Sequence, residues 1–278
     1  MTGTRVTTRT ARTTARTTTL SLAGAVVGLA ALIGAMTGLS AWSTAGASTG
    51  QQANPPAGAS KGQQAAPAAP LPTVDPALAA EARAADPDAP LVAFYGDSYT
   101  LGTGASDPAL RWSTTICADR GWTEFNPSVN GLGFVNNRAS TPPDYLDSDE
   151  IPQIIARDPD IVFVTMGLND NFSMPERADA IQNAIATDFT TLVAALPDAR
   201  IIVVEPFWYT DDRPPSVQTV IDWVDREAAA IGADRVPDAS QWLRGHPEWM
   251  AADGLHPDDQ GYAEMARRMD AALRELGL

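Results

Sequence analysis

Short apolar runs that alternate with longer amphipathic segments constrain the fold of this chain more than any other feature. The runs, beginning with "LVAFY" at residues 91–95, are continuously apolar rather than alternating, which is typical of parallel strands buried on both faces. The last amphipathic segment repeats Tyr262, Met265, Met269 and Leu273 at helical spacing. This order predicts a doubly wound α/β sheet with helices on both faces, a three-layer α/β/α fold.

The predicted elements all fall in the last two thirds of the chain. The expected parallel strands are 91–95, 123–129, 161–166, 200–205 and 235–237. The expected helices are 109–120, 148–157, 175–196, 216–231 and 258–276.

Residues 1–47 are typical of an export signal. An apolar run at 20–39 precedes Ala45-Gly46-Ala47, which fits a cleavage site of small residues. An uncleaved membrane anchor is the alternative, because the run approaches the roughly 20 residues that span a bilayer. The residues before the run include no acid and four basic residues, Arg5, Arg9, Arg12 and Arg16. We therefore expect a protein that is secreted or extracellular, or anchored at the cell surface by this segment.

Residues 48–88 are rich in Ala, Pro and Gln and contain few large apolar side chains. Such a composition cannot bury enough surface to fold, so we expect a disordered linker. The folded domain is then 89–278, which is long enough for one hydrophobic core.

Charge excludes nucleic acid as a partner. The chain has 19 basic and 34 acidic residues, and its only lysine is Lys61. Removal of residues 1–47 takes away four arginines and no acid, which leaves 15 basic against 34 acidic residues, a net charge of −19. Phosphate binding requires a basic surface that this composition lacks. The sequence also shows no dinucleotide fingerprint and no His or Cys cluster at metal-ligand spacing, so we expect no cofactor and no metal. Separately, we expect a monomer.

Three polar, glycine-bearing turns follow predicted strands. Gly96-Asp97-Ser98 follows the first strand, Asn130-Gly131-Leu132-Gly133 the second, and Gly167-Leu168-Asn169-Asp170 the third. In a parallel sheet these turns converge at the carboxyl edge, where ligands bind.

Ser98 has one well-placed partner for nucleophilic chemistry. A reactive serine needs a base, a carboxylate that orients the base, and donors for the oxyanion. His256 stands three residues after Asp253, close enough for the carboxylate to reach Nδ1 across a turn. His246 lacks such a neighbour in our interpretation and suits a surface or packing role.

These four blocks, Gly96-Asp97-Ser98, Gly133, Gly167 to Asp170, and Asp253-Gly254-Leu255-His256, resemble those of the SGNH or GDSL hydrolase family in order and spacing. The resemblance covers the whole predicted domain and no part of residues 1–88. It implies a flavodoxin-like SGNH fold and a carboxylic ester hydrolase that works through an acyl-enzyme.

The resemblance also implies roles. Ser98 would be the nucleophile, His256 the base and then the acid, and Asp253 the residue that orients it. The oxyanion donors would be the N–H of Ser98, the N–H of Gly133 and the Asn169 amide, with Gly131 as the alternative to Gly133. Asp97 and Asp170 would accept backbone hydrogen bonds around the turns.

Simpler roles compete with these. Ser98 could cap the next helix, Asn169 could form a turn, and Asp253 and His256 could be an ordinary loop pair. Cys117 is interpreted as a buried structural thiol. The aromatic residues that we expect at the substrate entrance are Tyr99, Phe134, Trp208 and Tyr209.

The substrate is left open. A short-acyl or acetyl ester of envelope or extracellular carbohydrate is our first hypothesis. A lipase, a thioesterase and an O-acyltransferase with the same site are the alternatives, and an inactive tethered glycan-binding module is an alternative of another class.

Overall fold

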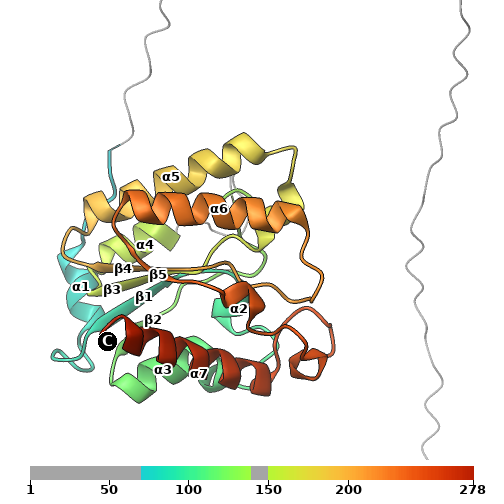
Figure 1. Cartoon of the computed structure of the whole chain (residues 1–278). Helices are drawn as coiled ribbons and strands as arrows, with labels where there is room; N and C mark the ends of the chain where they lie inside the picture. Colours follow the sequence, from blue (N-terminus) through green and yellow to red (C-terminus); the bar gives the residue numbers. More distant parts are fainter. Residues whose placement is uncertain (1–69, 139–149) are drawn as a thin grey trace, which may run out of the picture. The chain divides into compact units, whose positions relative to one another are not determined.

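The computed structural model describes residues 70–138 and 150–278, which contain a five-stranded parallel sheet in the order β2-β1-β3-β4-β5 (Figure 1). Every neighbouring pair is parallel, with Val92 opposite Ile161 and Ile161 opposite Arg200. The order reverses at β1, so the switch point of the sheet lies between β1 and β3. The predicted doubly wound α/β fold is confirmed.

The elements follow the predicted alternation. The strands are β1 (Leu91–Tyr95), β2 (Thr123–Phe125), β3 (Ile161–Val164), β4 (Arg200–Val204) and β5 (Asp234–Val236). The α-helices are α1 (Pro76–Ala82), α2 (Ser98–Leu101), α3 (Trp112–Arg120), α4 (Glu150–Ala156), α5 (Ala178–Ala195), α6 (Pro215–Ala230) and α7 (Asp259–Glu275). The 3₁₀ helices are η1 (Pro108–Leu110), η2 (Asn169–Ser173), η3 (Ala239–Gln241) and η4 (Pro247–Trp249).

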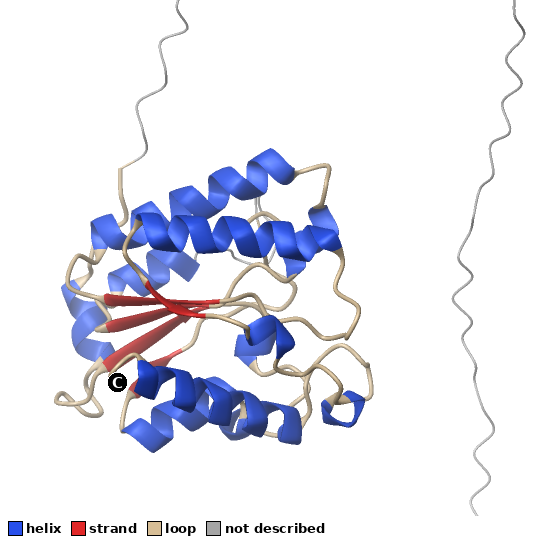
Figure 2. Cartoon of the chain, in the orientation of Figure 1, coloured by secondary structure: helices blue, strands red, loops and turns tan. Residues whose placement is uncertain are grey.

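Helices cover both faces of the sheet, with α3 and α7 on one side and α4, α5 and α6 on the other (Figure 2). Because successive side chains of a strand point to opposite faces, β1 supplies both cores. Val92 and Phe94 pack with the α3 and α7 side, while Ala93 and Tyr95 pack with the α4 and α5 side. All five residues of β1 are buried, which explains the continuous apolar run.

Element ends differ from the prediction where the chain turns toward the carboxyl edge. The second strand was expected to reach residue 129 and ends at Phe125. The expected helix 109–120 is divided, because Arg111 adopts an extended conformation between η1 and α3. Residues 148 and 149 of another expected helix lie outside the described residues.

The folded region begins before the predicted boundary at Ala89, which corrects the far end of the expected linker. Helix α1 is capped by Asp75, whose carboxylate accepts the N–H of Ala77 at 2.9 Å. Arg83 donates to the carbonyl groups of Arg157 at 3.2 Å and Asp158 at 2.5 Å. The helix buries no side chain, so polar bonds attach it to the rest of the domain. A hydropathy pattern cannot predict such bonds.

The export signal or anchor at 1–47 and residues 48–69 of the expected linker lie outside the described residues. Within 70–138 and 150–278, none of the helices combines the length and apolar character that a membrane crossing requires.

The aromatic contacts of Phe163 predict a large stability difference between two phenylalanines. Phe163 is fully buried, and its ring lies 5.1 Å from that of Phe94 and 6.1 Å from that of Trp112. We expect Phe163→Ala to lower the free energy of unfolding by about 3–5 kcal/mol, because the substitution leaves a cavity. The matched control is Phe172→Ala, at a side chain that is 57% exposed, which should change it by less than about 0.5 kcal/mol. Urea denaturation measures both, and equal losses would contradict this core assignment.

Candidate active site

The switch point between β1 and β3 carries two of the predicted site residues. Ser98 begins α2 directly after β1, and Asn169 begins η2 after β3. Both side chains are almost completely buried, at 5% and 7% exposure. The strand order therefore brings together residues that are 71 positions apart in the sequence.

Ser98 does not cap the helix that it begins. The cap is Asp97, whose Oδ1 accepts the N–H of Tyr99 at 2.9 Å. The capping role proposed for Ser98 is therefore wrong, and its hydroxyl is left for another use. Asp97 is structural, as predicted.

Asp253 holds the ring of His256. Asp253 Oδ2 lies 2.7 Å from His256 Nδ1, and Asp253 Oδ1 accepts the N–H groups of Leu255 at 2.9 Å and His256 at 3.0 Å. The hydrogen bonds from the His256 backbone and ring, followed by that from Leu255, lower the pKa of Asp253 to about 2. The carboxylate stays ionised at neutral pH and fixes the tautomer that keeps Nε2 unprotonated.

Ser98 and His256 line the same cavity, of about 250 Å³. Its wall also includes Asn169, together with Gly131 and Tyr99. No hydrogen bond joins Ser98 Oγ to the His256 ring within the described part of the chain, and catalytic contacts often tighten only when substrate binds. The tertiary structure thus groups the serine, the amide and the Asp253-supported histidine, which reduces the case for an ordinary loop pair.

Asn169 is held by two bonds from its amide nitrogen. Nδ2 donates to the carbonyl oxygen of Leu132 at 2.9 Å and to Asp97 Oδ2 at 3.2 Å. These bonds link the turns after β1, β2 and β3. The amide is therefore positioned by tertiary contacts as well as by the local turn.

Gly131, rather than Gly133, lines the cavity beside Ser98, so our first choice of oxyanion donor is not on the cavity wall. Gly133 is buried, and its N–H already donates to the carbonyl oxygen of Asn136 at 2.9 Å. A Cβ on Gly133 would lie 2.6 Å from the Asp170 carboxylate, so this glycine allows close packing behind the site. The spacing could not separate the two glycines, because they differ only in the direction that the loop gives them.

Asp170 fixes that loop from the neighbouring turn. Its carboxylate accepts the N–H groups of Phe134 at 2.7 Å, Val135 at 2.9 Å and Asn136 at 3.2 Å. Burial raises the pKa of Asp170 to about 6, although these bonds oppose the shift. The structural role predicted for Asp170 is confirmed.

Most of the aromatic residues expected at the entrance are core residues. Phe134 and Trp208 are buried, at 0% and 3% exposure. Tyr99 lines the cavity although it is buried, and its hydroxyl donates to the carbonyl oxygen of Leu255 at 2.5 Å. Only Tyr209 is partly exposed. Cys117 is free and buried, and burial raises the pKa of its thiol, which confirms the structural interpretation.

Gly104 is a site residue that the sequence gave no reason to choose. A Cβ at this position would lie 2.4 Å from the carbonyl oxygen of Pro257 and 3.1 Å from His256 Cβ. The residue therefore lets the histidine turn approach the segment after α2. Its signal in the sequence, "GTGAS", is too common to single out.

Metal ligation has no support in the part of the chain that the structure describes, where no group of three or more His, Cys, Asp or Glu side chains could hold an ion.

The fold and the cavity at its switch point define an α/β protein with a hydrolase-like carboxyl edge. Residues 94–264, more than half of the chain, match the model of the GDSL-like lipase/acylhydrolase family. The chain therefore belongs to this family, and it is an enzyme of the GDSL/SGNH esterase type.

Relatives agree with this assignment. A GDSL lipase of Mycobacterium tuberculosis is 28% identical over 185 residues, which cover 64% of this chain and 79% of the relative. The acetylxylan esterase Axe2 of Geobacillus stearothermophilus has a similar structure, with a TM-score of 0.52 and 20% identity over 68% of this chain and 94% of the other. The esterase EstA of Pseudoalteromonas sp. also has a similar structure, with a TM-score of 0.51 and 14% identity over 67% of this chain and 97% of the other. The structures support the fold alone.

The position of Gly133 predicts which glycine is needed for stability. Gly133→Ala should lower the free energy of unfolding by up to about 3 kcal/mol, because its methyl group would displace a carboxylate held by three N–H groups. Gly131→Ala is the control, since its Cβ would meet only Asn137 Nδ2, at 3.0 Å. Because φ at Gly131 is +72°, we expect Gly131→Ala to lower the free energy of unfolding by about 1 kcal/mol. Thermal unfolding of both variants tests this order, and a Gly133→Ala protein as stable as Gly131→Ala would contradict it.

Burial of Asp97 predicts a stability that depends on pH. Desolvation raises the pKa of Asp97 to about 7 in the folded protein, whereas an unfolded aspartate titrates near about 4. Between these values the folded state binds the extra proton, so the free energy of unfolding falls as pH rises, by at most about 1.4 kcal/mol per pH unit from this group.

An Asp97→Asn variant lacks this titration. The difference in the free energy of unfolding, wild type minus variant, should fall from pH 4 to pH 7 and then level off. Urea denaturation at several pH values measures it. A difference that stays constant across this range would show that Asp97 titrates normally.

Proposed function

We propose that this enzyme hydrolyses carboxylic esters through an acyl-enzyme on Ser98. The observation that carries the proposal is one cavity lined by Ser98, Asn169 and His256, with Asp253 bonded to His256 Nδ1 at 2.7 Å. This is the set of groups that nucleophilic ester cleavage requires.

The reaction has two balanced steps. His256 Nε2 takes the proton of Ser98 as Oγ attacks the carbonyl carbon, and the alcohol leaves with that proton. His256 then takes a proton from water, which attacks the acyl-enzyme, and Ser98 is released with its proton while the carboxylic acid departs. Asp253 keeps the ring oriented and stabilises its charged form.

Three donors would stabilise the oxyanion. They are the N–H of Ser98, the N–H of Gly131 and the side-chain amide of Asn169. We assign Gly131 in place of Gly133 because Gly131 lines the cavity and the Gly133 N–H is bonded elsewhere. Asn169 would exchange the longer of its two bonds, 3.2 Å to Asp97, for a bond to the oxyanion.

For the substrate we propose a short-acyl or acetyl ester of a carbohydrate outside the cell. The similarity to an acetylxylan esterase and a cavity of only about 250 Å³ beside Ser98 support a small acyl group. The basic and apolar segment at the N-terminus supports export, with secretion or anchoring as the two routes.

A lipid ester is the second candidate. Phe172 lies three residues after Asn169 and is 57% exposed, which suits contact with an acyl chain. The curated relative is also called a lipase.

Substitutions in the proposed machinery should separate catalysis from folding. We expect Ser98→Ala and His256→Ala to lower kcat by several orders of magnitude, because the triad acts as a unit. Asn169→Ala should lower it about 10²- to 10³-fold, the usual loss for one oxyanion donor. Steady-state hydrolysis of p-nitrophenyl esters from acetyl to palmitoyl measures the rates and the preferred chain length.

The other histidine supplies the matched control. His246→Ala should hydrolyse p-nitrophenyl acetate at the wild-type rate. A full rate in Ser98→Ala would overturn the proposal, and a full rate in Asn169→Ala would remove that residue from the oxyanion site. Preference for palmitoyl esters would favour the lipase, while an added sugar alcohol that outcompetes water would identify an acyltransferase.

A further inference from the structure

A second cavity, of about 360 Å³, lies beside the candidate active site and has no role in the chemistry described above. The residues that matter here are Tyr209, Asp211, His246, Met250 and Gly254, which all line it. Its volume is in the range of small-ligand sites.

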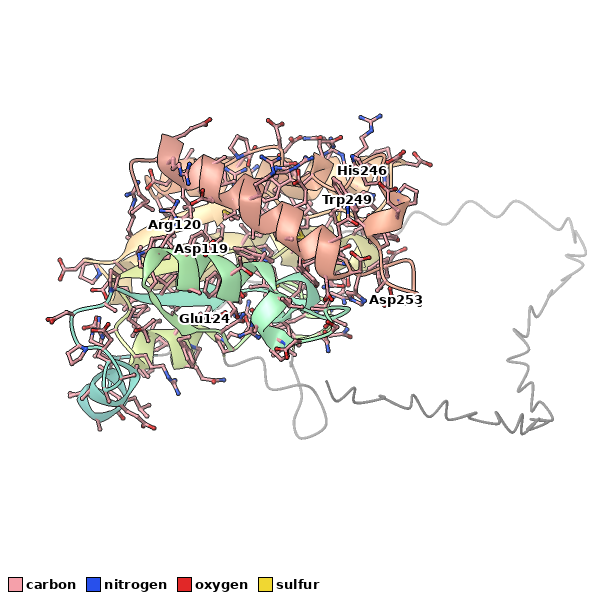
Figure 3. All side chains as sticks on the ribbon, turned by 90° about the horizontal axis from the view of Figure 1, so that it is seen from below. Asp119, Arg120, Glu124, His246, Trp249 and Asp253 are labelled. Carbon is pink, nitrogen blue, oxygen red and sulfur yellow. The ribbon has the colours of Figure 1, made fainter. Side chains whose placement is uncertain are left out.

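The turn that carries His256 also forms part of this cavity's wall. Met250 pairs with Pro257 in an antiparallel bridge, and the N–H of Ala251 donates to the carbonyl oxygen of His256 at 2.8 Å. Gly254 faces the second cavity, whereas the next two residues of the turn line the first. In Figure 3, His246 and Trp249 lie at the same end of the domain as Asp253. The two cavities therefore share this turn as part of their walls.

The ring of His246 is held in a fixed orientation. It stacks on Trp249 with a centroid distance of 3.5 Å and an interplanar angle of 5°, and its Nδ1 lies 2.9 Å from Glu248 Oε1. The arrangement resembles the Asp253 and His256 pair, so the expectation that His246 has no carboxylate neighbour was wrong. The aliphatic hydroxyl group on this cavity's wall, Thr210 Oγ1, donates instead to the carbonyl oxygen of Asp212 at 2.8 Å. We therefore interpret the pair as a binding group rather than as a base for a nucleophile.

The rest of the wall combines the apolar side chains of Leu243, Pro247 and Met250 with the ring of Tyr209 and the carboxylate of Asp211. The ring of Tyr209 is partly exposed and packs against Trp208 at a centroid distance of 4.7 Å. Asp211 Oδ1 accepts the N–H of Gly245 at 2.6 Å, which holds the carboxylate in place. An acyl chain in this cavity would remove Asp211 and His246 from water without replacing their hydrogen bonds. A sugar ring presents hydroxyl groups to such side chains and an apolar face to an aromatic ring.

We propose that this second cavity binds a sugar unit in the alcohol part of the ester. The inference rests on the proposed esterase function and adds to it the position of the carbohydrate. Tyr209 provides the apolar surface, and Asp211 and His246 Nε2 provide the hydrogen-bonding groups. The acyl group then occupies the cavity beside Ser98.

The test compares two esters in the full-length enzyme. One is p-nitrophenyl acetate, which has no sugar, and the other is an acetylated xylo-oligosaccharide. We expect Tyr209→Ala and His246→Ala to raise KM for the oligosaccharide at least about 10-fold, the effect of losing one good contact. Their kcat/KM for p-nitrophenyl acetate should stay within about 2-fold of wild type, because its leaving group carries no sugar hydroxyl groups for these side chains to bind.

Two variants serve as controls. Tyr209→Phe keeps the ring and should retain the wild-type KM. Asp212→Ala removes a neighbouring carboxylate that lines only a different cavity, whereas Asp211 lines both, and it should have no effect on either ester. An unchanged KM for the oligosaccharide in both Tyr209→Ala and His246→Ala would overturn the proposal. So would equal losses on the two esters.

Binding measured without turnover separates this inference from the proposed function. Isothermal titration of the Ser98→Ala protein with the deacetylated xylo-oligosaccharide should show binding, and adding Tyr209→Ala should weaken it about 10-fold. If the wild type hydrolyses no ester, the proposed function fails, and this titration still decides on the sugar site. Absence of binding by Ser98→Ala would overturn the inference even if p-nitrophenyl acetate is hydrolysed. Near-UV circular dichroism checks that each variant is folded.

Discussion

The carboxylate of Asp170 accepts three backbone N–H groups, and the loop that follows β2 depends on these bonds for its position at the carboxyl edge. Strands β2 and β3 lie on either side of β1, so the bonds join the turns of these two strands across the end of β1. Ser98 lies at that end. Hydrogen bonds to a charged group each contribute roughly 1.5–3 kcal/mol, which offsets part of the cost of burying the charge. The loop that holds Gly131 is thereby fixed relative to Asn169.

At the same edge of the sheet, two aspartate side chains are buried, and burial makes their ionisation unfavourable. Asp97 and Asp170 are almost fully buried, and desolvation raises the pKa of both, to about 7 and about 6. Each carboxylate also serves the site, since Asp97 holds the Asn169 amide and Asp170 holds the glycine loop. Ionisation of these buried carboxylates lowers stability at neutral pH, and their hydrogen bonds keep the turns around the serine rigid. Rigid positioning of donors is what stabilisation of a developing oxyanion requires.

The two histidines of the chain show how similar local pairs can differ in use. Each has a carboxylate on Nδ1, Asp253 for His256 and Glu248 for His246. Their surroundings differ, because His256 shares a cavity with Ser98 and Asn169, while His246 stacks on Trp249 beside a wall of apolar, aromatic and polar groups. The first arrangement suits proton transfer and the second suits recognition of a ligand.

The sequence by itself determined the alternation of strands and helices, the triad candidates and the family, because buried parallel strands are continuously apolar and the motif blocks are local. It could not determine the choice between Gly131 and Gly133, the attachment of α1, or the second cavity at His246. Those features depend on the direction of a loop set by the distant Asp170, on polar bonds from Arg83 to Asp158, and on segments 209–211 and 246–254 meeting in space. Such contacts join residues far apart in the chain, so only the tertiary structure decides them.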